Sequence, residues 1–230
     1  MEVKIMETKI PIHETLIIGA LLAMAAGSLD AYTYLVHGEV FAGLQTGNLI
    51  LLGIHLFAGT GPGVSRYLIA IGAFMIGTVI IRLLQQHYPE DRKPRRQLIV
   101  LAWEIICIVI VALFSAQIAD YWASALLSIT AAAQLQEFRK LKGAPFTSLM
   151  MTGNLRTLAA DLADGFFLND KKALQKAKDI GLIIVSFVFG ATLTSVLVPF
   201  LQDQTILLSG LWLVLTFVLL IISPLKMAHK

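Results

Sequence analysis

The sequence predicts an all-α membrane protein with six transmembrane helices and two short re-entrant half-helices, arranged as an inverted internal repeat. Three observations lead to this fold class. Hydrophobic residues make up 57% of the chain and charged residues only 14%, against roughly 25% charged in an ordinary soluble domain. A polar triplet, Thr46-Gly47-Asn48, returns as Thr152-Gly153-Asn154. Nearly all lysines and arginines lie between the apolar runs rather than inside them.

Both triplets belong to longer segments, 27–59 and 133–165, that align at a constant offset of 106 residues. Each triplet follows an irregular linker and precedes a helix-like run closed by a glycine. The other identical positions are Leu29/Leu135, Leu35/Leu141, Leu49/Leu155, Leu52/Leu158, Leu56/Leu162 and Gly59/Gly165. A polar motif repeated with its surroundings indicates a duplicated unit. We therefore interpret the chain as one membrane domain, 1–230, with repeat 1 at 13–117 and repeat 2 at 118–225.

Six apolar runs are long enough to cross a bilayer, which takes roughly 20 residues of helix. They lie at about 15–36, 64–86, 97–117, 119–138, 178–201 and 206–224. The polar leader before the first run resembles the start of a signal peptide. The run that follows is too long for one and contains half of the repeat, so we expect a first membrane helix there.

The two segments that follow the triplets differ from these runs. Leu49–Ala58 is apolar but spans only about 15 Å as a helix. Leu155–Phe167 contains Arg156, Asp161 and Asp164, which an ordinary membrane crossing avoids. We expect both segments to enter the bilayer and return on the same side.

The loop charges favour this six-crossing arrangement. With six crossings, the lysines and arginines of the loops, except Arg66, fall on one side of the membrane. The alternative has eight spans in two parallel four-helix repeats and divides these charges about evenly, against the positive-inside rule. Six crossings place both termini in the cytoplasm. Three crossings per repeat invert the repeats, so the two triplets enter the membrane from opposite faces.

Inverted repeats with broken helices form the substrate path in many transporters. Asp30 lies within the first apolar run, where an uncompensated carboxylate would cost about 2.5–3.5 kcal/mol on insertion scales. We expect Asp30 either to bind a proton, a cation or a solute amine, or to act as a structural brace by bonding to the triplet segment or to Tyr32. We expect the threonines to cap the short helices and the asparagines to present amides. The predicted substrate-binding residues are Asp30, Thr46, Asn48, Gln136, Thr152 and Asn154.

The alternative for the triplets is that they only satisfy the broken backbone and pin the two halves together. Other polar residues favour structural explanations. We expect Glu104 to be interfacial and His55 to be a packing residue. We expect Arg156 to pair with Asp161 or Asp164 on its own helix.

Several classes of function are not indicated. We find no nucleophile and base pair, no metal spacing and no nucleotide loop, so no enzyme, cofactor or metal is expected. The net charge of +3 is too small to indicate nucleic-acid binding. The single cysteine, Cys107, cannot form an intrachain disulfide. The expected partners are the lipid bilayer and an unknown small solute, and a homo-oligomer is left open.

The run Gly27–Ala31 together with the two triplets resembles the YoaK-like membrane proteins, known by the domain of unknown function numbered 1275. The resemblance covers roughly residues 13–225. It implies a multi-pass protein of the bacterial inner membrane with a presumed transport role. The family usually carries a glutamine-asparagine pair where this chain has Gln136-Glu137, so the chain departs from the family at this position.

The function that we expect is transport of a small solute, anionic or polar and with proton coupling as an option, along the interface of the two repeats. The alternatives are a passive channel and a membrane scaffold or regulatory subunit that transports nothing.

Overall fold

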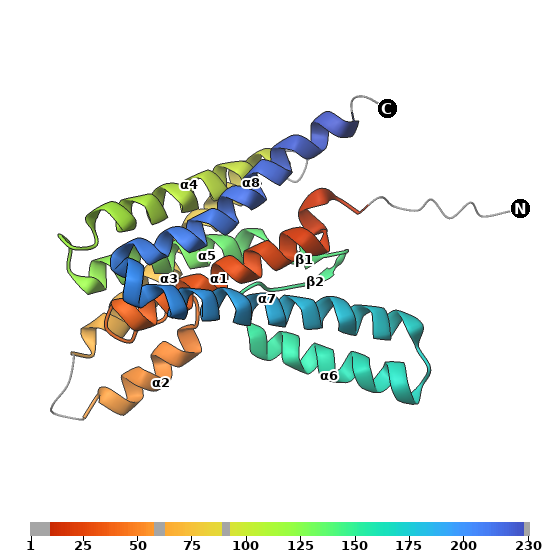
Figure 1. Ribbon diagram of the computed structural model, residues 1–230, viewed down its shortest axis with the longest axis horizontal. Helices are drawn as coiled ribbons and strands as arrows, with labels where there is room; N and C mark the ends of the chain where they lie inside the picture. The colour runs from red at the N-terminus through yellow and green to blue at the C-terminus, as the bar shows by residue number, and fades with distance from the viewer. Residues whose placement is uncertain (1–9, 58–62, 89–92, 228–230) are drawn as a thin grey trace, which may run out of the picture.

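The computed structural model describes residues 10–57, 63–88 and 93–227, and these form a bundle of helices (Figure 1). The long helices are α1 (Leu16–Val36), α3 (Ser65–His87), α4 (Lys93–Phe114), α5 (Asp120–Glu137), α7 (Lys171–Leu201) and α8 (Leu207–Met227). The shorter helices are α2 (Gln45–His55) and α6 (Met151–Phe167). The remaining elements are the 3-10 turns η1 (Ile12–Glu14) and η3 (Gln202–Ile206) and the antiparallel pair β1 (Lys140–Leu141) and β2 (Ala144–Pro145).

The predicted all-α membrane class is confirmed. By length and composition, α1, α3, α4 and the continuous helical stretch Lys171–Ile222 are each able to span a membrane. The 18-residue helix α5 is not among them, and it is rich in buried alanine and serine instead. It packs against α1, α3 and α4, so small side chains let these helices approach it closely.

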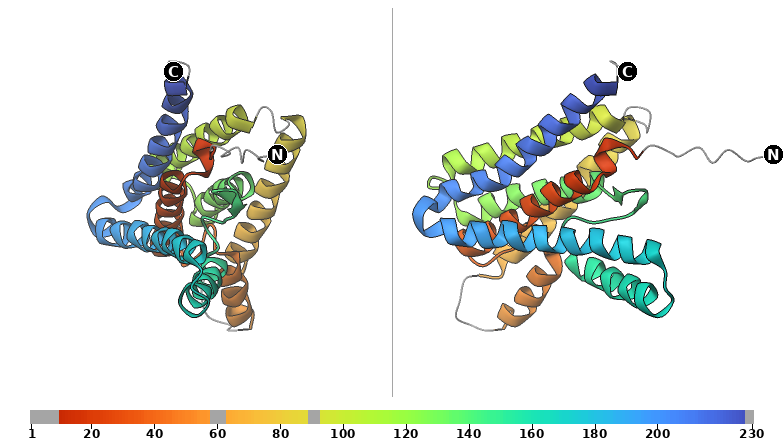
Figure 2. Two further views of the ribbon diagram at one scale, coloured as in Figure 1. Left: turned by 90° about the vertical axis from the view of Figure 1, so that its right-hand side faces the viewer. Right: turned by 45° about the vertical axis from the view of Figure 1, so that its right-hand side comes forward.

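Helix α1 lies at the centre of the bundle, and 78% of its most apolar stretch is buried. It packs most extensively against α7 and also contacts α8 and α5 (Figure 2). The crossing with α7 brings backbone against backbone. A Cβ atom on Gly27 would lie 2.1 Å from the Phe187 carbonyl oxygen, and one on Gly190 would lie 2.1 Å from the Met24 carbonyl oxygen. Only glycine fits at these two positions.

The long helices of the two halves of the chain contact each other in a reciprocal way. Helix α1 of the first half packs against α7 of the second, and α5 of the second half packs against α3 of the first. A Cβ atom on Gly77 of α3 would lie 2.8 Å from the Ile129 carbonyl oxygen of α5. Gly77 and Gly190 close two similar tetrapeptides, Phe-Met-Ile-Gly and Phe-Val-Phe-Gly. Both of these interhelical contacts therefore depend on a glycine.

The connections gather at two ends of the bundle (Figure 1). The start of α1, the β1–β2 hairpin, the α6–α7 turn and the end of α8 lie at one end. The α4–α5 and α7–α8 connections lie at the other end, and α1 and α5 run in opposite directions.

Helix α7 begins at Lys171, whereas the apolar run predicted a start at about 178. The first turns of this helix are polar, so a prediction from hydropathy leaves them out. The Asp170 side chain caps this start by accepting from the backbone N–H groups of Lys172 and Ala173.

Candidate functional site

Asp30 lies on α1 and is only 5% exposed. Its Oδ1 atom accepts hydrogen bonds from the backbone N–H of Gly43 at 2.6 Å and of Leu44 at 3.3 Å. Thr33, one turn later, accepts from the N–H of Ala42 at 3.1 Å. These N–H groups belong to the first linker, residues 37–44, which joins α1 to α2. Asp30 therefore holds a buried irregular backbone in place, as the brace interpretation expects.

Asn48 is fully buried near the start of α2 and is bonded on both edges of its amide. Its Oδ1 atom accepts from the Phe41 N–H at 2.9 Å, and its Nδ2 atom donates to the Phe41 carbonyl at 2.7 Å. The same Nδ2 atom donates to Gln45 Oε1 at 2.9 Å. Gly47 leaves room for the Phe41 ring, since a Cβ there would lie 2.9 Å from it. Asn48 thus closes the first linker onto the helix that follows.

Asn154 makes the corresponding contact in the second triplet. Its Nδ2 atom donates to the Thr147 carbonyl at 2.9 Å, in the second linker, residues 138–150. Thr147 stands 106 residues after Phe41, so the asparagine-to-linker bond recurs at the offset of the sequence repeat. Gly153 differs from Gly47, because nothing lies within 4 Å of a Cβ built there.

The expectation that Thr46 and Thr152 cap the short helices is wrong. Both helices begin one residue before the threonine, and the residues at the N-cap positions are Leu44 and Met150, with no side-chain cap. Both threonines are exposed. The asparagines and Asp30 already fix the linkers, so the helix starts need no hydroxyl to position them.

The two linkers meet inside the protein. A Cβ on Gly43 would lie 2.2 Å from the Leu149 Cδ2 atom, so these residues are in close contact. They are equivalent at the offset of 106 residues. From this contact α2 and α6 diverge along one side of the bundle (Figure 1, Figure 2). Four of the six predicted site residues therefore lie at the starts of the short helices, and a fifth, Asp30 of α1, bonds to the first linker.

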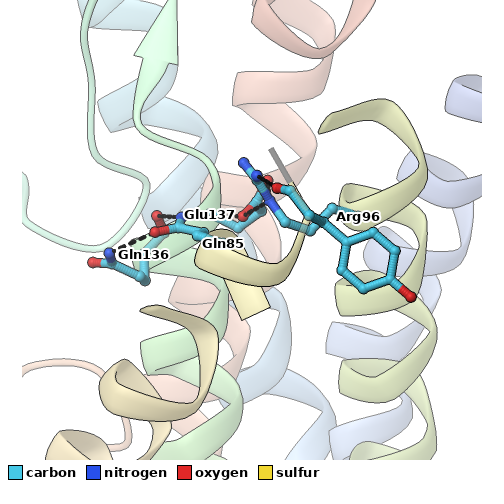
Figure 3. A network of polar contacts seen from close by, with 5 residues as sticks. Gln85, Arg96, Gln136 and Glu137 are labelled. Atoms are coloured by element: carbon cyan, nitrogen blue, oxygen red, sulfur yellow. Dashed lines mark hydrogen bonds and ion pairs between the residues drawn. The ribbon is translucent and has the colours of Figure 1, made fainter. Parts of the chain in front are cut away.

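Gln136, the sixth predicted residue, lies apart from the triplets, near the end of α5. Its Nε2 atom donates to Gln85 Oε1 at 3.1 Å (Figure 3). Gln85, on α3, donates in turn to the Gln136 carbonyl at 3.0 Å and to Glu137 Oε2 at 3.2 Å. Two side-chain amides and a carboxylate thus converge from two helices.

The same network contains a buried ion pair. Arg96 Nε lies 3.0 Å from Glu137 Oε1 and 2.9 Å from Oε2, and both side chains are buried. Another guanidinium nitrogen of Arg96 donates to the Tyr88 carbonyl. A pair of this kind is stable only when its remaining hydrogen-bonding atoms are satisfied. Gln85 and Tyr88 supply those additional bonds.

This network borders a cleft of about 860 Å³. It is lined by Arg82, Gln85, Gln86, Lys93, Arg96, Gln136, Glu137, Arg139, Lys140, Gly143 and Pro145. Five of these side chains are cationic and one is acidic. A concave surface with an excess of one sign of charge concentrates ions of the opposite sign. The cleft is therefore suited to an anionic or polar solute small enough to fit beside the glutamines.

Sequence reasoning selected Gln136 but missed Gln85 and Arg96. Arg96 lies among several basic residues at the start of an apolar run, where the positive-inside rule by itself accounts for cations. Its partner Glu137 is 41 positions away. No spacing rule predicts such a pair. The one signal was the departure from the YoaK-like pattern at Glu137.

Three structural expectations have clear outcomes. His55 is a packing residue, bonded to the Leu51 carbonyl and to the Tyr67 hydroxyl. Asp161 pairs with Lys176 of α7 at 3.4 Å and not with Arg156, because α6 packs against α7. Glu104, expected to be interfacial, is 0% exposed and lies inside the bundle.

Comparison with known proteins gives a consistent picture. A family model described as "Protein of unknown function (DUF1275)" matches residues 18–219. The chain is also 28% identical over 185 residues to the UPF0700 transmembrane protein YoaK of Bacillus subtilis (strain 168). That alignment covers 78% of this chain and 82% of the relative. No solved structure matches the chain.

Proposed function

We propose a function from the premise that this chain belongs to the DUF1275 family, as its resemblance to YoaK-like proteins predicted, and is a membrane protein. The function is transport of a small anionic or polar solute across the bilayer. The observation that carries it is the cationic cleft in which Gln85, Gln136 and the buried Arg96–Glu137 pair converge. A membrane protein that binds no solute has no need of such a cleft.

Each group of the cleft has a distinct part in solute binding. The five cations raise the local concentration of anions at the mouth. The amides of Gln85 and Gln136 offer donors and acceptors in place of the solute's water. An anion that reaches Arg96 competes with Glu137 for the same guanidinium. Binding then exchanges one ion pair for another, which lets the solute be held without being trapped.

The proposed architecture around the cleft is six crossings, with α2 and α6 as re-entrant half-helices in an inverted repeat. Three observations support it. Helices α1 and α5 run in opposite directions, α1 packs against α7 as α5 packs against α3, and the asparagine-to-linker bond recurs. The start of α4, the hairpin and the start of α7 lie at one end (Figure 1) and carry most loop cations. The positive-inside rule makes that end cytoplasmic, in a bacterial inner membrane.

A second candidate, a scaffold or regulatory subunit that transports nothing, is favoured by the pairing of Asp30. Its Oδ1 atom is occupied by two backbone N–H groups, and Asp30 is not among the residues that line the cleft. The scaffold alternative predicts that no solute binds the cleft. A passive channel predicts uptake that is driven only by the solute's own electrochemical gradient and not by a pH gradient.

The test begins with the purified full chain and a panel of small anions, namely phosphate, sulfate, nitrate and short carboxylates. A ligand at 100 times its Kd raises the stability of the folded state by about 2.7 kcal/mol, which a thermal unfolding scan detects. Any stabilising anion is then tested for uptake into proteoliposomes, with and without a pH gradient. Uptake that follows the pH gradient indicates coupled transport rather than a channel.

Matched variants link any binding to the cleft. Arg82→Gln and Lys140→Gln each remove one cation from the lining and should weaken both stabilisation and uptake. The control is Arg95→Gln. It removes an exposed cation at the start of α4 that does not line the cleft, and it should leave stabilisation and uptake unchanged. Equal effects of all three substitutions would remove the cleft from the mechanism. The absence of any stabilising anion would favour the scaffold.

A further inference from the structure

Glu104 is a carboxyl group that the proposed solute site does not use. It lies midway along α4, is 0% exposed, and neither of its carboxyl oxygens has a hydrogen-bond partner within the described parts of the chain. Burying an unpaired carboxylate is so unfavourable that such a group takes up a proton instead. Acidic residues within membrane helices commonly mark proton relays.

Two polar residues of α4, Arg96 and Gln97, lie on the cleft side of Glu104. Arg96 lines the cleft, and Gln97 beside it is buried with an Oε1 atom that has no donor among the described residues. Gln97 and Glu104 are seven residues apart, about two turns and 10.5 Å along the helix, and both face the interior. An unpaired acceptor thus lies between the cleft and the buried carboxyl group.

The charged surroundings of Glu104 contain little that would compensate an ionised carboxylate. On its own helix the cations are confined to the first turn, and Cys107 is the titratable group nearest in sequence. Helix α8 contributes no titratable side chain between 207 and 222. The titratable groups on the other elements that pack against α4 are Asp120, Tyr121 and Glu137 of α5, Arg66, Tyr67, Arg82 and His87 of α3, and Asp203 of η3. Glu137, whose charge acts on Glu104, is itself paired with Arg96.

We propose that Glu104 is a proton-binding site of the membrane interior, loaded from the cationic cleft past the Arg96–Glu137 pair and Gln97. In the loading step a water molecule in the cleft gives up a proton, an O–H bond forms at an ionised Glu104 oxygen, and a hydroxide ion remains among the cations of the cleft. Release reverses the step, and no electrons are transferred. The coupling role of this site rests on the proposed transport function, because a proton entering with an anion neutralises its charge. Proton binding itself requires no solute.

Infrared spectroscopy of the full chain in lipid tests proton binding directly. A protonated carboxyl group gives a C=O stretching band that disappears on ionisation and shifts in D2O. The wild type should show such a band, losing intensity as pH rises, and the difference spectrum between wild type and Glu104→Gln should isolate it. If Glu104→Gln does not fold, Glu104→Asp should move the band without abolishing it. Identical wild-type and variant spectra, or a Glu104 band that neither titrates nor exchanges with D2O, would overturn the proposal.

The loading route is tested by the rate of exchange. Gln97→Leu removes the intermediate acceptor and should slow the D2O shift of the Glu104 band several-fold. Thr194→Val is the matched control, because Thr194 on α7 is also fully buried and its hydroxyl has no partner among the described residues. Equal exchange rates in wild type and Gln97→Leu would contradict this route. Since no solute is used, a failure of the transport proposal leaves these results unaffected.

Discussion

Two polar regions of this protein contrast with each other: the first linker with Asp30 and Asn48, and the cleft with Arg96 and Glu137. In the linker region the side chains bond mainly to backbone N–H and carbonyl groups. In the cleft the side chains bond mainly to one another and border open volume. A polar residue inside a membrane protein is therefore not by itself a substrate site. Where irregular backbone lies nearby, the backbone uses the polar side chain first.

The largest effect is expected at the ion pair of the cleft. Arg96→Met alone leaves Glu137 buried and unpaired, which should lower the free energy of unfolding by about 3–5 kcal/mol. The double variant Arg96→Met with Glu137→Leu should recover most of that loss, because no charge then remains buried. Unfolding in denaturing detergent measures both. If the double variant is no more stable than Arg96→Met, the loss does not come from the unpaired Glu137 carboxylate.

A smaller loss is expected at Asp30. Asp30→Ala leaves the Gly43 and Leu44 N–H groups without their acceptor and should cost about 2–3 kcal/mol. Asp30→Asn keeps an acceptor oxygen and should cost clearly less. Unfolding measurements on the two variants, together with uptake measurements, separate brace from coupling acid. Loss of uptake in a fully stable Asp30→Asn would contradict a purely structural role.

The two triplet asparagines should differ from each other. Asn48→Ala removes three hydrogen bonds in a fully buried position and should cost about 2 kcal/mol. Asn154→Ala removes one bond to a backbone carbonyl and one weak contact to sulfur, and it should cost about 1 kcal/mol. The same unfolding assay measures the difference. Equal losses would indicate that Asn154 has a bonding partner equivalent to the Phe41 N–H.

The smallest effect is expected at the threonines of the triplets. Thr46→Val and Thr152→Val change exposed side chains that make no capping bond, so stability should change by no more than about 0.5 kcal/mol. Unfolding midpoints of the two variants against wild type check this. A loss near 1 kcal/mol would restore the capping role that the sequence suggested. A loss of uptake at unchanged stability would restore their role as substrate-binding residues.

Much of the fold was predictable from local patterns. Apolar runs located the long helices to within a few residues, apart from the polar first turns of α7. The repeated triplets located two short helices, and their asparagines do make matching contacts. The substrate-binding roles assigned to the six site residues stay predictions. Asp30, Asn48 and Asn154 bind linkers, the threonines are exposed, and only Gln136 lies at the cleft.

By itself, the sequence determined that this is a membrane protein and where its helices lie, and it indicated a duplication, because hydropathy and repetition are read within short stretches of chain. The tertiary structure alone decided which polar groups are used by backbone and which face open space. The Arg96–Glu137 pair and the unpaired burial of Glu104 both depend on helices brought together from distant positions. The strength of a charge or a hydrogen bond depends on burial and on partners, and only the packing of the whole bundle supplies these.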